Sequence, residues 1–553
     1  MVSVCFYFQV HQPFRMRKYS VFDIAKNHHY WDDEKNREIL ERVAKKCYLP
    51  TNKVMKEWIE KYDVKISFSF SGVVLEQFEK YQPEVLKSFQ DLIKTGNVEV
   101  LSETYHHSLA FLYSKEEFKK QIELHKKKVK KLFGVTPKVF RNTELIYNNE
   151  LANFIEGLGY KGILLEGWDS VLGWRSPNFL YQPVGTSKIK ALLKNYKLSD
   201  DIAFRFSNQG WSEWPLTAEK FAQWLSANNG NGNVVNLFMD YETFGEHQWE
   251  DTGIFDFLRH LPEELLKHPD NDFKTPSEVV DAYDTVGDID VHHLLSWADI
   301  ERDTSAWLGN KMQQSAANQI YSVEKEVLNS KDENLIEDWR KLQTTDHLYY
   351  MCTKWFSDGD VHKYFNPYDS PYDSFITYMN ILGDLSVRIK ENKGLVAEVG
   401  DKTAKPKAPK KKSSSKKKNS SKKKSTKAKK TKPKKSSKKK SKKTSKKSSK
   451  KSSKKSTKKK TKKKSTSKKP KKKAKAKKSK SKKTKSSKKS RKKPSKSLRK
   501  SKSGKKKKSK SSKKSTNEVL RLLPEKSTKK KSKKKSEDSL KKTYKALKKF
   551  LTS

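Results

Sequence analysis

The C-terminal part of this 553-residue chain contains almost no side chain that a folded core could bury. From Thr403 onward the sequence is Lys, Ser and Thr with occasional Pro and Ala. Such a segment cannot offset the conformational entropy that folding removes. We therefore predict that residues 393–553 form a disordered tail. Within it, residues 537–551 carry apolar side chains at helical spacing among lysines, which predicts a short amphipathic helix.

The tail and the rest of the chain carry opposite charge. Residues 401–553 hold 76 of the 124 basic residues and 5 of the 64 acidic ones, so their net charge is +71 and that of the first 400 residues is −11. Many lysines on a flexible chain release counterions from a polyanion, which gives salt-sensitive binding without base readout. The Lys/Ser blocks resemble the tails of linker histones. We expect DNA as the partner, then RNA or polyphosphate, then an anionic membrane or cell surface; a solubilising spacer is the alternative.

The first 290 residues alternate between short apolar runs and longer stretches with helical periodicity, such as 73–95, 115–133 and 148–158. This alternation is typical of βα units that build a parallel sheet. Seven runs predict strands: 2–10, 64–70, 98–102, 138–142, 162–166, 202–206 and 233–241. We expect the insertion at 17–61 to cover the open end of the sheet. Helix-forming segments dominate later, so we predict an α/β domain over 1–290 and a helical region packed on it over 291–392.

Polar residues follow the predicted strands at or near their carboxyl ends. In parallel α/β folds these ends share one face, and chemistry takes place there. Charges on a solvated surface would instead be scattered along the helices. Six residues are placed in this way: His11, Glu103, Glu144, Glu166, Asp240 and Glu242.

The acids among them suggest a reaction. Asp240 and Glu242 are two residues apart, so strand geometry points both carboxylates to one side, and Glu144 ends another strand. Two carboxyl groups in one cleft suit glycoside hydrolysis, in which one is the nucleophile and the other protonates the leaving oxygen. A single acid is more often an ordinary ion-pair partner. The gathering of six polar strand ends favours catalysis.

Histidines offer a second chemistry. His11 could donate to a sugar hydroxyl or bind a metal, although a lone histidine is more often a structural donor. His106 and His107 are adjacent and generally cannot both point into one site, so we expect one to be a spectator. The chain has no HxxxH or CxxC pair that would strengthen a metal site. We predict neither a metal nor a cofactor.

The remaining composition bears on location. Cys5, Cys47 and Cys352 are far apart, which is typical of a reducing compartment. The N-terminus lacks a basic stretch and a small-residue cleavage site, and no apolar run reaches the roughly 18 residues of a membrane-spanning helix. We predict a cytoplasmic protein without a transmembrane segment, or one associated with the nucleoid through its tail.

Tryptophans near predicted strand ends and in loops are candidates for stacking on the apolar faces of sugars. We assign this role to Trp168, Trp211 and Trp307, while Trp174, Trp214 and Trp249 are placed similarly. Core packing is the alternative for each of them.

Five segments in order resemble the signature regions of glycoside hydrolase family 57, in its α-amylase-like branch, over residues 1–390. They are VHQPF, GNVEVLSETYHH from 96, FRNTELIYNN around 144, MDYETFGEH around 240 and SAWLGNKMQ from 305. Five ordered segments make a specific match, whereas a single HQP or DxE would carry little weight. One departure is Gln9, where many members carry a second histidine, and this bears on sugar subsites more than on the catalytic pair.

The resemblance implies a distorted (β/α)7 barrel followed by a helical region. It also implies metal-independent cleavage of α-glucans with retention, with Glu144 as nucleophile and Asp240 as general acid and base, their carboxyl groups about 5 to 5.5 Å apart. His11, Glu99, Glu242 and Trp307 match motif positions and would bind substrate or orient the pair. We add Glu103, Trp168 and Trp211 to this substrate-binding set.

Several activities remain open. We expect an α-amylase, but the family also contains 4-α-glucanotransferases, branching enzymes and pullulan-cleaving enzymes. A different class would be a nucleic-acid-associated protein whose barrel is an inactive glucan-binding remnant. A third alternative is a metal-dependent polysaccharide deacetylase on a related barrel.

Overall fold

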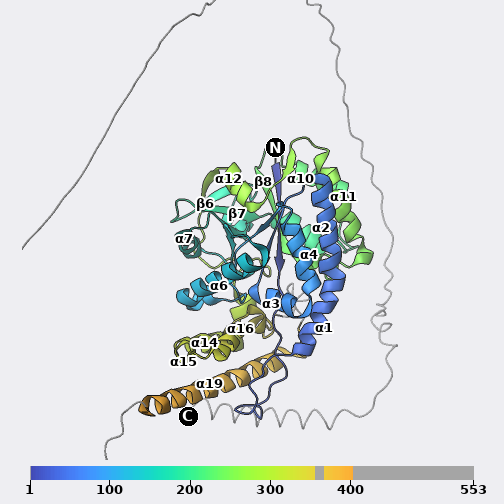
Figure 1. Ribbon diagram of the computed structural model, residues 1–553. Helices are drawn as coiled ribbons and strands as arrows, with labels where there is room; N and C mark the ends of the chain where they lie inside the picture. Colours follow the sequence, from blue (N-terminus) through green and yellow to red (C-terminus); the bar gives the residue numbers. More distant parts are fainter. Residues whose placement is uncertain (1, 355–365, 403–553) are drawn as a thin grey trace, which may run out of the picture. The chain divides into compact units, whose positions relative to one another are not determined.

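The computed structural model describes residues 2–354 and 366–402 (Figure 1). All described residues belong to one compact unit. The predicted disordered tail from residue 403 onward and its helix near 537–551 therefore lie outside the described residues.

Seven parallel strands form the centre of the molecule (Figure 1). They pair in the order β1 (Val2–Val10), β2 (Ile66–Phe70), β3 (Val98–Val100), β4 (Val139–Arg141), β5 (Gly162–Glu166), β7 (Lys190–Lys194) and β8 (Val234–Asp240), and β8 returns to β1. Two junctions are thin: β3 meets β4 through a bridge between Ser102 and Phe140, and β7 meets β8 at Lys194 and Asn236. The fold is α/β and consistent with the predicted distorted (β/α)7 barrel.

Six of the seven predicted strands form, and the prediction for 202–206 is wrong. That segment belongs to the π-helix η3 (Asp201–Arg205), which the ion pair between Arg205 and Asp201 at 2.6 Å stabilises. The seventh barrel strand is β7, whose apolar centre lies between Lys190 and Lys194 and is hidden in the sequence by these lysines. Three further strands lie outside the ring: β6 (Leu180–Pro183), β9 (Asn271–Phe273) and β10 (Thr285–Ile289).

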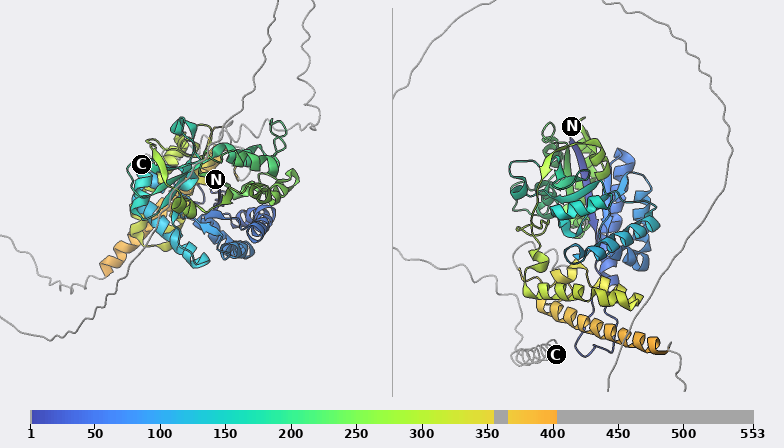
Figure 2. Two further views of the ribbon diagram at one scale, coloured as in Figure 1. Left: turned by 90° about the horizontal axis from the view of Figure 1, so that it is seen from above. Right: turned by 90° about the vertical axis from the view of Figure 1, so that its left-hand side faces the viewer.

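Helices surround the strands (Figures 1 and 2). The prediction for 115–133 is confirmed by α6 (Lys115–Phe133), and 73–95 divides in two because Pro83 starts a new helix. In the predicted insertion at 17–61, helix α2 (Leu49–Tyr62) packs against α4 and α11 outside the barrel, and the covering of the open end stays a prediction. The other helices before residue 290 are α1 (Asp33–Val43), η1 (Ala44–Tyr48), α3 (Gly72–Tyr81), α4 (Pro83–Ile93), α5 (Ala110–Tyr113), η2 (Thr143–Leu145), α7 (Asn149–Gly157), α8 (Asp169–Leu172), α9 (Tyr196–Asp200), α10 (Ala218–Ser226), η4 (Tyr241–Thr243), η5 (Glu250–Thr252), α11 (Ile254–Leu266) and α12 (Pro276–Ala282).

The interior of the barrel is apolar at one end and polar at the other. Side chains two residues apart on a strand point to the same face, so each strand contributes an alternating set to the interior. One buried cluster contains Cys5, Tyr7, Val139, Leu164, Leu192 and Phe238 from the strands, with Val279 and Val280 of α12. Continuing along the same faces toward the carboxyl ends brings Gln9, Arg141, Glu166, Lys194 and Asp240. The sequence alternation therefore places the polar residues together at the carboxyl face.

Beyond residue 290 the described chain is helical. The helices are α13 (Ser305–Leu308), α14 (Lys311–Ser322), α15 (Glu324–Ser330), α16 (Glu333–Lys341), α17 (Thr345–Tyr349) and α19 (Pro371–Lys402). Figure 2 shows them at one end of the barrel, with α19 packed on α14, α15 and α16. Because α19 reaches Lys402, the predicted start of the tail at 393 falls inside a helix. The boundary at 290 stays a prediction.

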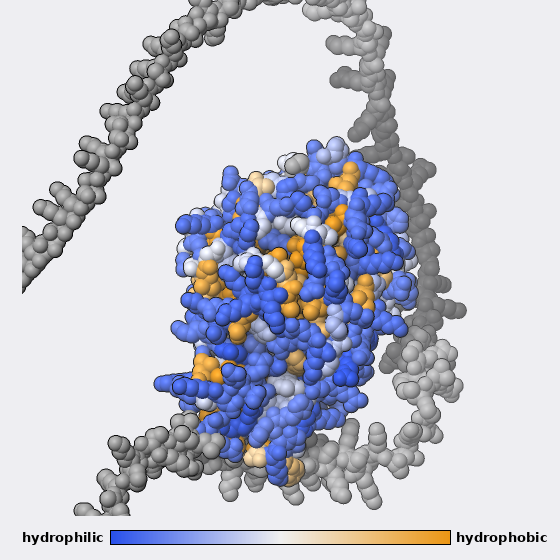
Figure 3. All heavy atoms as spheres, viewed as in Figure 1, coloured by the Kyte–Doolittle hydropathy of each residue, from blue (hydrophilic) through white to orange (hydrophobic). Residues whose placement is uncertain are grey.

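The surface seen in Figure 3 is mostly hydrophilic, with a band of hydrophobic residues across its middle. Within residues 2–354 and 366–402, no helix combines the length and the apolarity that crossing a bilayer requires.

Asp384 of α19 anchors the N-terminal loop to the helical region. Its carboxylate accepts hydrogen bonds from the Ala25 N–H at 2.7 Å, the Tyr30 hydroxyl at 2.6 Å and His28 Nδ1 at 2.8 Å. The carboxylate itself is fully buried.

We predict that Asp384→Ala lowers the free energy of unfolding by about 3 kcal/mol, because it leaves buried donors without an acceptor. Urea denaturation followed by circular dichroism measures this. Lys390→Ala, at an exposed position of the same helix, is the control and should change stability by less than about 0.5 kcal/mol. Equal stability of the two variants would contradict the anchoring role.

Candidate active site

Glu144 lies directly after β4, in a turn with unusual backbone geometry. Glu144 and Leu145 have φ angles of 56° and 50°, in the left-handed region that residues other than glycine rarely adopt. Such conformations cost on the order of 1–3 kcal/mol each and gather at functional sites. Trp297 holds the turn, because its backbone N–H donates to the Glu144 carbonyl at 3.3 Å.

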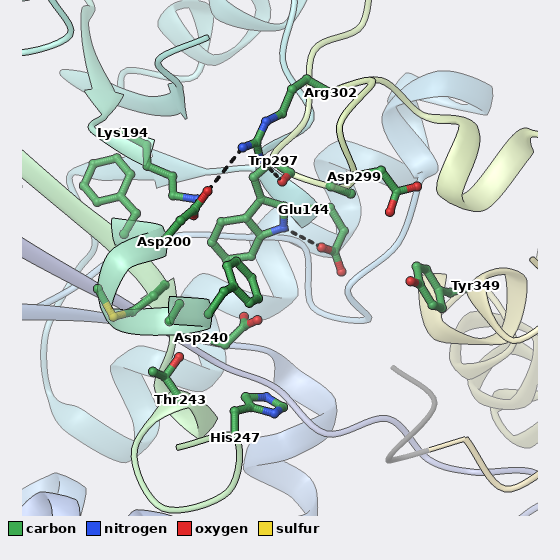
Figure 4. A pocket seen from close by; sticks show the side chains of 15 residues that line it. Glu144, Lys194, Asp200, Asp240, Thr243, His247, Trp297, Asp299, Arg302 and Tyr349 are labelled. Carbon is green, nitrogen blue, oxygen red and sulfur yellow. Dashed lines mark hydrogen bonds and ion pairs between the residues drawn. The ribbon is translucent and has the colours of Figure 1, made fainter. Parts of the chain in front are cut away.

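Both carboxylate oxygens of Glu144 accept hydrogen bonds. Trp297 Nε1 donates to Oε2 at 2.7 Å (Figure 4), and His107 Nε2 bonds Oε1 at 3.0 Å. The other ring nitrogen of His107 bonds Glu103 Oε2 at 3.1 Å. Because an imidazole can present an N–H group to two carboxylates only when it is protonated, we assign His107 the imidazolium form.

The pKa values of this chain agree with the assignment. Burial favours the neutral ring of His107, but the hydrogen bonds to Glu103 and Glu144 outweigh it and raise the pKa of His107 to about 9. Burial also disfavours the Glu103 anion, yet the hydrogen bond and charge of His107 lower the pKa of Glu103 to about 2. The three side chains form an anion–cation–anion chain that ends at the Glu144 carboxylate.

Asp240 ends β8, and Glu242 follows it in η4. The Glu242 carboxyl is buried and accepts hydrogen bonds from the Tyr48 hydroxyl and from Gln12 Nε2. Burial, reinforced by the negative charge of Asp240, raises the pKa of Glu242 to about 8. This carboxyl is therefore protonated at neutral pH.

Two cavities meet at these acids, and Glu144, Asp240 and His247 line both of them (Figure 4). The first cavity has aromatic walls, with Trp297, Phe204 and Tyr349. The second is lined mainly by polar groups, among them Gln9, His11, Gln12, Arg141, Glu242 and Asp346. An elongated ligand with a bond between Glu144 and Asp240 would occupy both cavities.

His11 connects the barrel to the helical region. Its Nδ1 bonds the Ser71 hydroxyl at 2.7 Å and its Nε2 bonds Asp346 of α17 at 2.8 Å. The ring stacks on His107 with centroids 4.0 Å apart. Burial and the charge of His107 lower the pKa of His11, which favours a neutral ring beside the imidazolium.

Glu166 also reaches the site, within an ion cluster at the first cavity. Its carboxylate lies 3.5 Å from Lys194 Nζ and 3.3 Å from Arg302, and both cations also contact Asp200. Arg302 donates to the carbonyl of Trp297, so the cluster supports the residue that holds Glu144 (Figure 4).

The sequence analysis missed several residues of the site. Trp297 and Asp346 come from the chain beyond the barrel, where the sequence has no strand end to mark them. Lys194 ends a strand that was not recognised. Of the adjacent histidines, His107 faces the site, whereas the buried ring of His106 makes no hydrogen bond within the described residues.

Five predicted substrate-binding residues line neither cavity. Glu103 is one of them: it is buried and reaches the site only through its bond to His107. Glu99 lies four residues before Glu103 and accepts the Ser277 N–H at 2.7 Å on α12, toward the opposite end of the barrel. Trp307 is 1% exposed and belongs to the core. Trp168 packs against the same core, and Trp211 packs on Trp224. The substrate-binding role of these three tryptophans stays a prediction.

Across residues 2–354 and 366–402, His, Cys, Asp and Glu form no group of three that could hold a metal ion. Cys5, Cys47 and Cys352 are free thiols.

Comparison with known proteins identifies the family. The sequence profile of glycosyl hydrolase family 57 matches residues 5–292, more than half of the chain. The chain belongs to glycosyl hydrolase family 57. The segments around Glu144 and Asp240 lie within the matched range, and both reach the two cavities.

Relatives within family 57 carry different names. A provisionally named alpha-amylase of Methanocaldococcus jannaschii is 48% identical over 405 residues, which span 70% of this chain and 85% of that protein. A 4-alpha-glucanotransferase of Thermococcus litoralis is 26% identical over 166 residues, which span 30% of this chain and 25% of that protein. A GH57-type branching enzyme of Pyrococcus horikoshii matches in structure with a TM-score of 0.51 and 15% identity, over 66% of this chain and 87% of that one. The last likeness concerns the fold.

The raised pKa of Glu242 predicts a pH-dependent penalty on folding. An unfolded glutamate ionises near pH 4.3, whereas folded Glu242 keeps its proton up to a pH of about 8. Between these values folding retains a proton that the unfolded chain releases, so the penalty is absent at pH 4 and grows toward pH 8.

Glu242→Gln removes this penalty and keeps an oxygen acceptor for Tyr48. We expect the variant to exceed the parent in free energy of unfolding by about 2 kcal/mol at pH 8, with the excess vanishing near pH 4. Urea denaturation at pH 4, 6 and 8 measures it, with exposed Glu250→Gln as control. A gain that is the same at all three pH values would refute the assignment.

Proposed function

We propose that this protein is a retaining, α-amylase-like glycoside hydrolase that acts on α-1,4-glucans. The observation that carries the proposal is the convergence of Glu144 and Asp240 on both cavities. Membership of family 57 and the 48% identity to the Methanocaldococcus jannaschii protein support it.

In this proposal Glu144 attacks the anomeric carbon and Asp240 gives its proton to the leaving glycosidic oxygen. A covalent glycosyl-enzyme forms and the leaving sugar departs. Asp240 then takes a proton from water, which attacks the same carbon and releases Glu144. The donors Trp297 Nε1 and His107 Nε2 hold the carboxylate in one orientation and stabilise its charge when it departs.

In this proposal each cavity binds a different part of the substrate. The polar groups of the second cavity, including His11, Gln12 and Glu242, suit the hydroxyls of the sugar ring under attack. The aromatic wall of the first cavity suits the apolar face of the departing or incoming sugar. Phe204 is 52% exposed there, so its ring is available to stack on a sugar.

Glucan transfer is the second candidate, favoured by the same aromatic wall and by the Thermococcus litoralis relative named a 4-alpha-glucanotransferase. Hydrolysis and transfer share every step up to the covalent intermediate, and they differ in whether water or a sugar hydroxyl takes the glycosyl group. The products formed from pure maltooligosaccharides separate them, because transfer yields chains longer than the substrate.

We predict that Glu144→Gln abolishes activity, with kcat lowered at least about a thousandfold, because an amide cannot act as the nucleophile. Reducing ends released from amylose and the products from maltoheptaose measure this. Glu150→Gln, at an exposed position of α7, is the matched control and should keep full activity. A Glu144→Gln variant that remains active would remove Glu144 as nucleophile.

The tail suggests a second, independent property, which is binding to nucleic acid or another polyanion. Residues 401–553 carry +71 and the rest of the chain −11, so we assign the attraction to the tail. It would fix where the enzyme is held and leave the reaction unchanged.

We predict that deletion of residues 403–553 eliminates retardation of duplex DNA, and that the affinity of the full-length protein falls steeply as salt rises from 50 to 200 mM. The truncated protein should retain its activity on maltooligosaccharides. Full-length Glu144→Gln should still bind DNA. Binding that is independent of salt, or that survives the deletion, would rule out the electrostatic tether.

A further inference from the structure

A tightly held loop follows Glu242 and leads to Trp249. The His247 N–H donates to the Glu242 carbonyl at 3.0 Å. Gly245 has a φ of 102°, and a Cβ at this position would lie 1.9 Å from the carbonyl oxygen of Lys46, so only glycine fits. The loop is therefore pressed against η1, the helix that carries Lys46.

The ring of Trp249 is held at one edge and is otherwise half open to solvent. Its Nε1 donates to the Glu246 carbonyl at 2.9 Å within the same loop. The residue is 52% exposed, whereas Trp307 in the core is 1% exposed. The exposed side chain of Lys46 extends over the indole, with Nζ 5.3 Å from the ring centre. An aromatic face and a cationic donor therefore lie together on the surface.

Trp249 stands close to the first cavity. His247, two residues earlier, lines both cavities (Figure 4), and two residues of chain span at most about 7 Å. Between them, Gln248 Nε2 donates to the Ala203 carbonyl at 2.8 Å. Ala203 and Phe204 belong to the wall of the first cavity. One hydrogen bond thus joins the loop of Trp249 to the aromatic wall of this cavity.

An indole beside an ammonium group suits a sugar. The apolar face of a glucose ring can stack on the indole, while the ammonium donates hydrogen bonds to the hydroxyls at the edge of the ring. Binding sites for small ligands combine aromatic surface with a few placed polar groups in the same way. A loop that is already fixed loses little conformational freedom when such a ligand binds.

We propose that Trp249 and Lys46 form an outlying binding site for one glucose unit of an α-glucan. The site lies beyond the first cavity, on the side of the leaving or incoming sugar, and this assignment rests on the function proposed above. Trp249 lines neither cavity, so its role is to bind substrate at a distance from the reacting bond. Chains long enough to extend past Phe204 gain affinity from it, and shorter chains do not.

The test is the dependence of binding on chain length, measured by isothermal titration calorimetry with maltotriose, maltopentaose and maltoheptaose. The full-length protein carries Glu144→Gln so that the sugars are not consumed. In this background Trp249→Ala should weaken binding of maltoheptaose about fivefold, the effect of one aromatic contact, and leave that of maltotriose within about 1.5-fold. Trp249→Phe keeps an aromatic face and should restore most of the lost affinity.

Two further variants control for folding and for position. Lys46→Met removes the donor at an exposed site and should weaken binding of maltoheptaose about threefold, which tests the same site if Trp249→Ala does not fold. Trp174→Ala is the matched control, because Trp174 is 95% exposed and lines neither cavity. Its neighbour Arg175 bonds the Asp288 carbonyl on β10, outside the ring of strands. This variant should bind every chain as the parent does.

An equal loss for maltotriose and maltoheptaose in Trp249→Ala would place the effect in the cavities and overturn the inference. Unchanged binding of maltoheptaose in both Trp249→Ala and Lys46→Met would overturn it as well. Activity of Glu144→Gln would instead refute the proposed function. The ratio of kcat/KM for amylose to that for an aryl maltotrioside, in Trp249→Ala and in the parent, then makes the same comparison of long and short chains.

Discussion

The imidazolium of His107 is the interaction on which the site depends. It joins Glu103 after β3 to Glu144 after β4, at the thin junction where these strands meet through a single bridge. Its ring also stacks on His11 from β1, and His11 in turn bonds Asp346 of α17. One protonated ring therefore contacts side chains that follow three different strands, and through His11 it is linked to Asp346 of α17. The hydrogen bonds of the site add to the single backbone bridge between β3 and β4.

Charges are unevenly distributed within the site, and also between the first 400 residues and the rest of the chain. The group around Glu144 combines anions with cations, whereas Asp240 and Glu242 are neighbouring acids of which at least one holds a proton at neutral pH. Two carboxyl groups with different environments are what an acid–nucleophile pair requires. The barrel is mildly acidic and holds its buried cations among acids. The excess positive charge of the molecule lies beyond residue 400.

The sequence predicts those site residues that come at or just after the carboxyl end of a strand. His11, Glu103, Glu144, Glu166 and Asp240 gather because parallel strands end on one face. Glu99 points the same way as Glu103, but four residues on a strand span about 13 Å, so it lies at another height in the barrel. The segment 202–206 was predicted as a strand because of its aromatic run, but most of it is helical. The strand at 190–194 was missed because lysines flank its apolar centre. Trp297 and Asp346 reach the site through tertiary packing, which local pattern does not encode.

The contribution of Trp297, Asp346 and Tyr349 has a consequence for how the enzyme comes into being. All strands of the barrel and both catalytic candidates are synthesised before residue 290. This part of the chain contains both acids, yet it lacks the indole that holds Glu144, the aspartate that bonds His11 and the tyrosine that lines the first cavity with Phe204. The site is complete only when residues 297–349 lie against the barrel, so translation must pass residue 349 before the enzyme can have its full site.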